Sequence, residues 1–120
     1  MKVIAKCPTR VDLVGGTLDL WPIFNFLGGA HTINVAIDIY TQAELTKLNK
    51  PDVIIEIENT KFKKTFKDLK SLLKDKNPKL DFIRPQLEYW KPVFGFHLKT
   101  SSQSPVGGGL GGSSSLTISI

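Results

Sequence analysis

The sequence has few of the residues that build disulfides, metal centres or nucleophilic sites. Cys7 is its only cysteine, so the chain has no internal disulfide and no thiolate metal cluster, which suits a reducing compartment. Its two histidines, His31 and His97, are far apart and belong to no H-x-x-x-H or H-E-x-x-H spacing. We therefore assign no metal role to either, and we expect Cys7 to be a buried packing residue of an apolar strand.

Long apolar runs and nucleic-acid motifs are also missing. No stretch reaches the roughly eighteen apolar residues of a membrane span, and the first residues are too short an apolar run for a signal peptide. The net charge is +5, but many lysines fall in residues 61–79 among single Phe and Leu residues, a pattern typical of a solvated face. No zinc-finger or RNP1 signature accompanies them. We expect a soluble, cytoplasmic protein that binds neither membrane nor nucleic acid.

The apolar spacing predicts a series of strands followed by helices. Strands are expected at residues 3–7, 10–14, 32–39, 43–48, 53–58, 62–66 and 93–99, and helices at 66–73, 80–90 and from Ser113. Pro8 should separate the first two strands, and Asn59 and Thr60 should turn a hairpin. This order suits an α+β domain with helices against one face of a mixed sheet.

Aromatic residues gather beside an early turn of the chain. Trp21, Phe24 and Phe26 follow Gly15 and Gly16, which end the second predicted strand. Aromatic side chains in such a place can line a pocket, but they more often form a local core. We expect the local core and leave these residues out of the candidate site.

Glycine is concentrated in one stretch of the chain. Residues 104–115 read Ser-Pro-Val-Gly-Gly-Gly-Leu-Gly-Gly-Ser-Ser-Ser, so five of six consecutive positions are glycine. Glycines allow several backbone N–H groups to face one anion, and the first turn of a following helix adds unpaired donors. A flexible linker has a similar composition. However, Pro105, Leu110 and the apolar residues 116–120 favour an ordered, phosphate-binding loop.

Two common phosphate motifs fit this stretch poorly. A Walker loop requires a lysine after its last glycine, and none is present. The dinucleotide pattern G-x-G-x-x-G occurs at Gly107, Gly109 and Gly112, but a run so rich in glycine matches it by default. The acidic residue that contacts the ribose in that motif would also lie past residue 120.

A third motif fits better. Pro105-x-x-x-Gly109-Leu110-Gly111-Gly112-Ser113-Ser114 resembles the P-x-x-x-G-L-[GS]-S-S-[AS] loop of the galactokinase, homoserine kinase, mevalonate kinase and phosphomevalonate kinase (GHMP) superfamily. Its G-L-G-G-S-S form is similar to that of heptose-phosphate and related sugar kinases. Residues 7–19 resemble the opening P-G-[RK]-[VI]-x-L-x-G-x-x-x-D of these enzymes, and residues 31–38 resemble their next strand, A-[VL]-N-[VL]-A-I-D.

The resemblance implies a fold and an activity. The fold is the α+β, ribosomal-protein-S5-domain-2-like N-terminal domain of a GHMP kinase, and residues 1–120 would be its ATP-binding domain, truncated before the C-terminal domain. The implied enzyme is an ATP- and Mg²⁺-dependent kinase. It would transfer the γ-phosphoryl group to a hydroxyl of a sugar, sugar phosphate or mevalonate-like acceptor.

The resemblance also implies roles for particular residues. Arg10 is the catalytic candidate, because its guanidinium is a fixed fork of donors for phosphate oxygens. Asp19, Gly16 and Thr17 are the acceptor-binding candidates. Galactokinases have Glu and His where this chain has Gly16 and Thr17, which disfavours a galactose site of that kind. The nucleotide would be held by Pro105, Gly107, Gly108, Gly109, Leu110, Gly111, Gly112, Ser113 and Ser114, with Ser113 also contacting magnesium.

Two alternatives remain open at this point. Several family members use an aspartate base and an acidic magnesium ligand from later segments, so the chain is alternatively a non-catalytic nucleotide- or anion-binding module or an inactive fragment. Nucleic-acid binding through the lysines would depend steeply on salt. The apolar residues 116–120 also predict that a C-terminal segment or a partner chain covers them.

Overall fold

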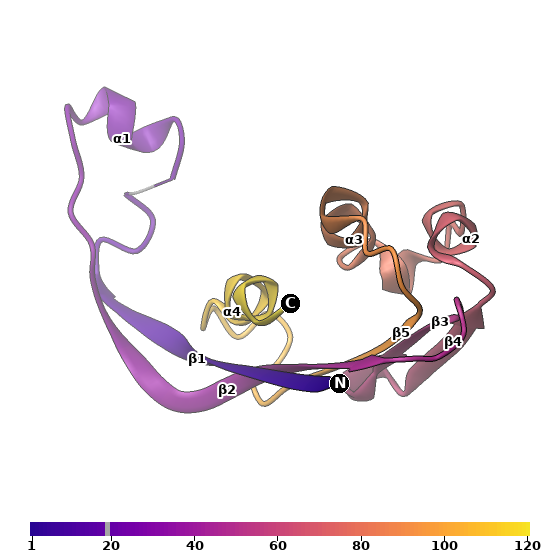
Figure 1. Ribbon diagram of the computed structural model, residues 1–120. Helices are drawn as coiled ribbons and strands as arrows, with labels where there is room; N and C mark the ends of the chain where they lie inside the picture. The colour runs from indigo at the N-terminus through magenta and orange to yellow at the C-terminus, as the bar shows by residue number, and fades with distance from the viewer. Residues whose placement is uncertain (19) are drawn as a thin grey trace.

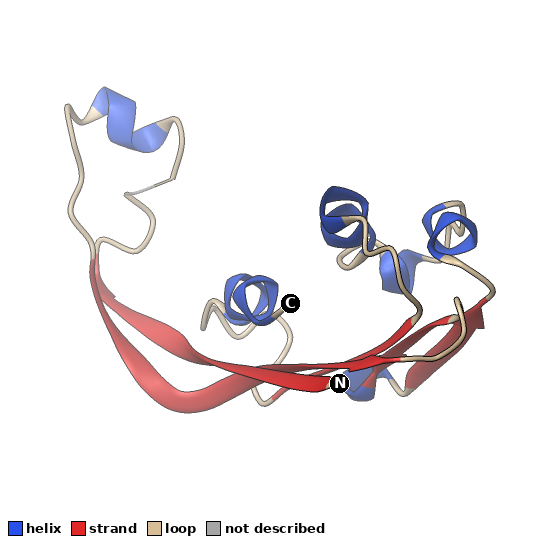
Figure 2. Cartoon of the chain, viewed as in Figure 1, coloured by secondary structure: helices blue, strands red, loops and turns tan. Residues whose placement is uncertain are grey.

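The computed structural model describes residues 1–18 and 20–120, which form a curved mixed sheet with helices along its concave face (Figures 1 and 2). The strands are β1 (Lys2–Val14), β2 (Ile33–Lys47), β3 (Val53–Ile57), β4 (Phe62–Phe66) and β5 (Phe96–Ser102). Their order in the sheet is β1-β2-β5-β3-β4, and only the β3–β5 pair is parallel. The predicted mixed sheet is therefore confirmed.

The helices are short and occupy one side of the sheet. They are α1 (Ile23–Phe26), α2 (Leu69–Leu73), α3 (Arg84–Trp90) and α4 (Gly112–Ser119), with 3₁₀ turns η1 (Glu58–Thr60) and η2 (Pro78–Leu80). Helices α2, α3 and α4 lie over the concave face, as predicted (Figure 2). Helix α2 begins later than expected because Phe66 ends β4 and Asp68 caps the helix, accepting a hydrogen bond from the Ser71 amide at 2.7 Å.

The first two predicted strands are one continuous strand, and so are the next two. Pro8 does not break β1, because β1 is at the edge of the sheet, where a missing N–H is tolerated. Pairing with β2 instead shifts register between Pro8 and Thr9, from Tyr40 to Ile37. Such irregularities bend strands, and the β1–β2 hairpin is visibly curved (Figure 1).

Strand β5 lies further along the chain than the apolar run at 93–99 predicted. Val93 is 98% exposed and precedes the strand. Gly95 passes so close to the Lys50 carbonyl oxygen that a side chain would collide with it, and the Phe96 amide then donates to the Asp52 carbonyl at 3.0 Å. The strand therefore begins where the chain meets β3, which apolar character alone does not show.

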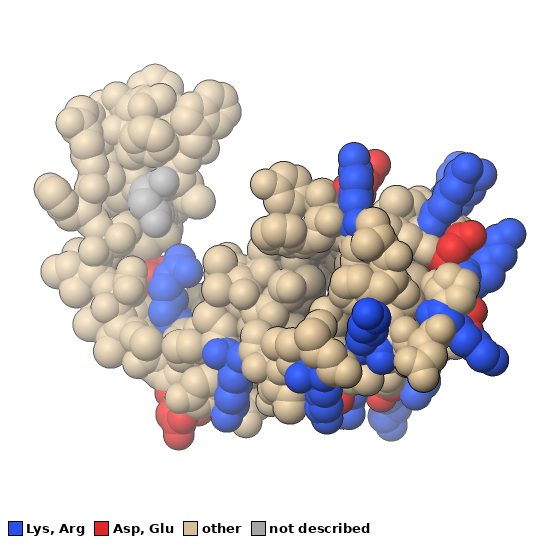
Figure 3. All heavy atoms as spheres, viewed as in Figure 1, with Lys and Arg blue, Asp and Glu red and all other residues tan. Residues whose placement is uncertain are grey.

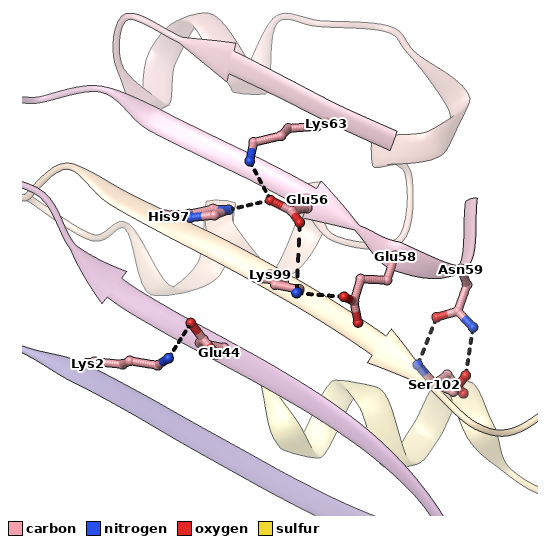
Figure 4. Close-up of polar contacts among 9 residues, drawn as sticks. All are labelled: Lys2, Glu44, Glu56, Glu58, Asn59, Lys63, His97, Lys99 and Ser102. Carbon is pink, nitrogen blue, oxygen red and sulfur yellow. Dashed lines mark hydrogen bonds and ion pairs between the residues drawn. The ribbon is translucent and has the colours of Figure 1, made fainter. Parts of the chain in front are cut away.

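Alternation along the strands separates an apolar face from a charged one. The buried core beneath the helices consists of Ala43, Val53, Ile55, Phe66, Leu72, Leu80, Ile83, Leu87, Phe96 and Leu98. The opposite face carries an ionic network centred on Glu56 (Figure 4). Its carboxylate accepts a hydrogen bond from Lys63 at 2.7 Å and contacts His97 Nε2 at 3.0 Å. The hydrogen bond from Lys63 is the main cause that lowers the pKa of Glu56.

The far part of the β1–β2 hairpin forms an uncharged arm, which we define as residues 13–35. Asp19 apart, this segment contains no Lys, Arg, Asp or Glu. In Figure 3 no Lys, Arg, Asp or Glu is coloured on the described part of the arm, whereas Lys and Arg gather at the other end of the molecule. Trp21 and Phe26 are 77% and 84% exposed, so the expected local core of aromatic residues is wrong. The tip of the hairpin has no element packed against it that would bury them (Figure 1).

The structure also bears on the expected burial of Cys7 and on membrane-spanning segments. Cys7 is half-buried and not fully buried, because it lies on the edge strand β1. Among the described residues, no helix has the length and apolar character that crossing a membrane requires.

Replacing Ile55 with Ala should destabilise the fold by about 3 kcal/mol, since Ile55 is fully buried and its loss leaves a cavity under the helices. Urea unfolding followed by circular dichroism measures this loss. The matched control is Ile54→Ala, which removes the same atoms from the partly exposed, opposite side of β3 and should cost clearly less. Equal losses would contradict the assignment of the two faces.

Glu56→Gln should flatten the loss of stability in acid. The pKa of Glu56 is lowered in the folded state, so its contribution is present above the ordinary value of 4.5 and is lost as the pH falls through the lower folded value. Unfolding midpoints measured across this range test the prediction. Glu88→Gln, which removes a carboxylate that makes no ion pair with the described residues, is the matched control.

Candidate functional site

The glycine loop, residues 105–111, connects β5 to α4 and has a backbone that requires glycine. Gly107, Gly109 and Gly111 have φ angles of +76°, +67° and +65°, a region that residues with a side chain rarely adopt. The Gly108 amide donates to the Pro105 carbonyl at 3.1 Å and closes a turn at the start of the loop. The predicted ordered loop is therefore a folded turn and not an extended linker.

The N-terminus of α4 presents free backbone donors. Gly111 is the N-cap residue in a left-handed conformation, and no side chain caps the helix. Within the described residues, the amides of Gly112, Ser113 and Ser114 have no acceptor, whereas the Ser115 amide bonds to the Gly111 carbonyl at 2.9 Å. Ser113 and Ser114 are exposed. Free donors and the positive end of the helix dipole together favour an anion here.

Helix α4 rests on the sheet through hydroxyl groups. Ser115 donates to the Pro8 carbonyl at 2.8 Å, and Ser119 lies 3.2 Å from the Thr41 hydroxyl, both Ser119 and Thr41 being buried. Side chains this small allow the helix to approach β1 and β2 closely. Ile120 packs against the core, whereas Ile118 is 76% exposed, so part of the apolar segment is already covered.

Arg10 lies beside the glycine loop. Its backbone N–H donates to the Leu110 carbonyl at 3.1 Å, and a Cβ added at Gly111 would lie 3.0 Å from Arg10 Nη1. The Arg10 Nε donates to Asp12 Oδ1 at 3.1 Å, which orients the guanidinium. Two motifs that are far apart in the sequence therefore meet at one place.

The turn after β1 lies next to the same ion pair. A side chain at Gly16 would approach Asp12 Cβ to 2.6 Å, and one at Gly15, where φ is +77°, would collide with the His31 carbonyl. Gly16 and Thr17 thus belong to a tight turn adjoining Asp12. Asp19 lies outside the described residues, so its acceptor role stays a prediction.

A hollow of about 400 Å³ adjoins the glycine loop. Its walls combine the loop with residues from the end of β3, from η1, from α4 and from the segment before α3, namely Ile57, Asn59, Thr60, Phe82 and Leu116. The sequence analysis did not select any of these residues. Their only signal was the predicted turn at Asn59 and Thr60. Asp12 was missed as well, although its spacing of two from Arg10 places both on one face of a strand.

Comparison with known proteins identifies the fold. No protein-family model matches the chain, and no curated protein matches it. Among solved structures, the chain is similar to the Methanococcus jannaschii mevalonate kinase, with 23% identity, a TM-score of 0.73, and coverage of 99% of this chain and 38% of that chain. It is also similar to a D-glycero-D-manno-heptose 1-phosphate kinase from Bacteriodes thetaiotaomicron, with 20% identity, a TM-score of 0.79 and coverage of 98% and 39%.

A third solved structure agrees with these two. Lactococcus lactis galactokinase, complexed with galactose, has 21% identity and a TM-score of 0.69, and the match covers 98% of this chain and 30% of that chain. All three are GHMP kinases, and the chain has the fold of their N-terminal part. The fold implied by the two sequence motifs is therefore confirmed. The chain spans well under half the length of each of these structures.

Gly111→Ala should destabilise the protein more than Gly109→Ala. Both positions have positive φ, so each substitution should cost about 1 kcal/mol in backbone strain. Only at Gly111 does the new methyl group meet Arg10, because nothing lies within 4 Å of a Cβ at Gly109. Urea unfolding of the two variants measures the difference.

The Arg10→Ala background provides the control for this comparison. The extra cost at Gly111 should vanish there, because the side chain that causes it is gone. An extra cost that persists without the Arg10 side chain would contradict the contact.

Proposed function

We propose that this chain is the nucleotide-binding part of an ATP-dependent kinase acting on a small molecule. The observation that carries the proposal is the position of Arg10, whose partly exposed guanidinium lies beside the glycine loop and the uncapped N-terminus of α4. A loop of backbone amides and an arginine facing one region form a site for polyphosphate. The fold, which is that of the N-terminal part of GHMP kinases, supports the same conclusion.

The proposed nucleotide site has two parts. The phosphates rest on the glycine loop and on the free amides of Gly112, Ser113 and Ser114. The base and ribose occupy the adjoining hollow, whose size suits part of a small ligand. Ile57, Phe82 and Leu116 provide apolar surface for a planar base, and the loop residues Pro105 and Leu110 also line the hollow.

The residues present fit a magnesium ion that arrives with its nucleotide. The described residues contain no group of three or more His, Cys, Asp or Glu side chains able to hold a metal by themselves. The exposed Ser113 hydroxyl is one suitable oxygen ligand. Magnesium usually keeps several waters and binds through few protein groups plus substrate phosphates. Ser113 would therefore hold the ion from the protein side.

The transfer step needs position and charge compensation more than covalent chemistry. Bound ATP supplies the phosphoryl group. Arg10 donates to the phosphate oxygens and compensates their charge. Asp12 binds the Nε of Arg10, which leaves the Nη groups for the phosphates. Gly16 and Thr17, with Asp19, form the side on which the acceptor hydroxyl approaches.

The proposed acceptor is a sugar, a sugar phosphate or a mevalonate-like alcohol. The three similar structures described above are a mevalonate kinase, a heptose 1-phosphate kinase and a galactokinase. The turn at Gly16 packs directly against Asp12, which places the proposed acceptor-binding residues beside the Arg10–Asp12 pair. In this proposal, residues 1–120 form the N-terminal, ATP-binding domain, and the acidic residues of the transfer step belong to a C-terminal part.

A second candidate is a nucleotide-binding module without catalysis. It is favoured by the lack of an acidic cluster among the described residues. Nucleotide binding is common to both candidates. Turnover separates them.

Titration calorimetry with MgATP tests the shared part of the proposal. Ser113→Ala and Arg10→Gln should each weaken binding about tenfold, the effect of losing roughly one charge-assisted hydrogen bond. Ser101→Ala is the matched control, because β5 directs Ser101 to the same face as His97 and Lys99, away from the loop. The proposal fails if the wild type does not bind MgATP, or if Ser113→Ala binds it as tightly as Ser101→Ala does.

An acceptor panel tests catalysis. ADP formation is measured with MgATP and each of a set of sugars, sugar phosphates and mevalonate-like acids. From residues 1–120 alone we expect weak or absent turnover. Acceptor-dependent turnover that Arg10→Gln abolishes would establish a kinase complete in this chain and would overturn the assignment of the acidic groups to another part.

A further inference from the structure

The side chain of Asn59 continues the β3–β5 ladder past the point where β3 ends. The parallel register pairs Ile57 with Thr100, so the next equivalent step would place residue 59 opposite Ser102. The backbone leaves the strand at Glu58 to form η1, yet the Asn59 amide occupies this step (Figure 4). Its Nδ2 donates to the Ser102 carbonyl at 2.6 Å, and its Oδ1 accepts from the Ser102 amide at 2.8 Å.

These two bonds explain why the residue is asparagine. A carboxamide has one face with a donor and an acceptor, like a peptide group, so it can replace a backbone neighbour. Aspartate would keep only the acceptor, and alanine would keep neither. Each polar atom of Asn59 makes one hydrogen bond to Ser102, and the residue also lines the hollow beside the glycine loop.

Ser102, which is held by Asn59, is in turn hydrogen-bonded to the residue that precedes the glycine loop. Its Oγ accepts a hydrogen bond from the Ser104 amide at 3.1 Å and donates to the Ser104 carbonyl at 3.3 Å. Ser104 is 8% exposed and immediately precedes the glycine loop. A Cβ added at Gly112 would lie 2.9 Å from Ser104 Oγ, so the two ends of the loop touch at this point. Asn59 is therefore linked, through Ser102 and Ser104, to the first residue of α4.

From these contacts we infer that Asn59 is a positioning residue for the polyphosphate, acting through the geometry of the glycine loop and not by contact with the base. The inference rests on the proposed function, since it concerns the same site. It requires that loss of the Asn59 amide weaken every ligand held by the loop by a similar factor, whether or not the ligand carries a base.

The test compares MgATP with magnesium tripolyphosphate, which has no base, by titration calorimetry. Asn59→Ala should weaken both ligands about tenfold, the size expected for losing two neutral hydrogen bonds that order the loop. If Asn59 acted by touching the base, MgATP alone would weaken. That result would overturn the inference.

The control variant is Thr60→Ala. Thr60 lines the same hollow, but its hydroxyl contacts only the Ile57 carbonyl, at 3.5 Å, among the described residues. We expect both ligands to bind this variant as they bind the wild type. Equal affinities of Asn59→Ala and Thr60→Ala would also overturn the inference, while MgATP binding by the wild type would leave the proposed function standing.

A second measurement distinguishes local loosening of the loop from destabilisation of the whole fold. Hydrogen exchange of the Ser102 and Ser104 amides should quicken in Asn59→Ala, while exchange of buried core amides such as that of Ile55 stays slow. If Asn59→Ala does not fold, Asn59→Asp replaces it. This variant keeps the acceptor but places a carboxylate oxygen against the Ser102 carbonyl and adds a negative charge near the phosphates, so it should weaken both ligands by at least about tenfold. An unchanged affinity in Asn59→Asp would contradict the inference.

Discussion

The close seating of α4 on β1 and β2 is the constraint on which the rest of the site depends. The helix contacts the sheet through Ser115 and Ser119, whose small side chains bond to the Pro8 carbonyl and the Thr41 hydroxyl. A helix with large apolar residues at these positions would stand further from the sheet. The glycine loop would then no longer reach the edge of β1, where the Leu110 carbonyl accepts from the Arg10 amide. Hydroxyl side chains on the face of α4 that meets the sheet are thus an advantage here. They bury less apolar surface than large side chains would, but they allow the helix to lie closer to β1 and β2.

Local pattern was enough to predict the glycine loop, a mixed sheet with helices on one face, and the β3–β4 hairpin. Features that depend on how segments distant in the sequence pair could not be predicted from local pattern. Pro8 lies within a continuous strand because β1 is an edge strand, and edge position is a property of the whole sheet. The start of β5 is set by the contact of Gly95 with the Lys50 carbonyl. The role of Asn59 requires the register of β3 against β5, which its own neighbours in sequence do not specify.

The glycines of the loop serve two different physical needs. At Gly107 and Gly109 nothing surrounds a prospective side chain, so only the backbone conformation calls for glycine. At Gly111 and Gly112 space is short as well, because Arg10 and Ser104 lie within about van der Waals distance. The first pair shapes the turn, and the second pair joins it to the strand edge and to the helix. A sequence motif records only the residue type and therefore does not distinguish these two needs.

The uneven placement of charge has a consequence for how the molecule behaves in solution. The described residues of the arm include exposed Trp21, Phe26 and other apolar side chains but no Lys, Arg, Asp or Glu, whereas the β4–α2 end carries most of the lysines (Figure 3). The molecule is therefore amphiphilic, with an apolar end and a cationic end. Molecules of this kind adhere by their uncharged ends and repel one another by their charged ends. Raising the salt concentration weakens the repulsion and leaves the adhesion, so colloidal stability declines with ionic strength.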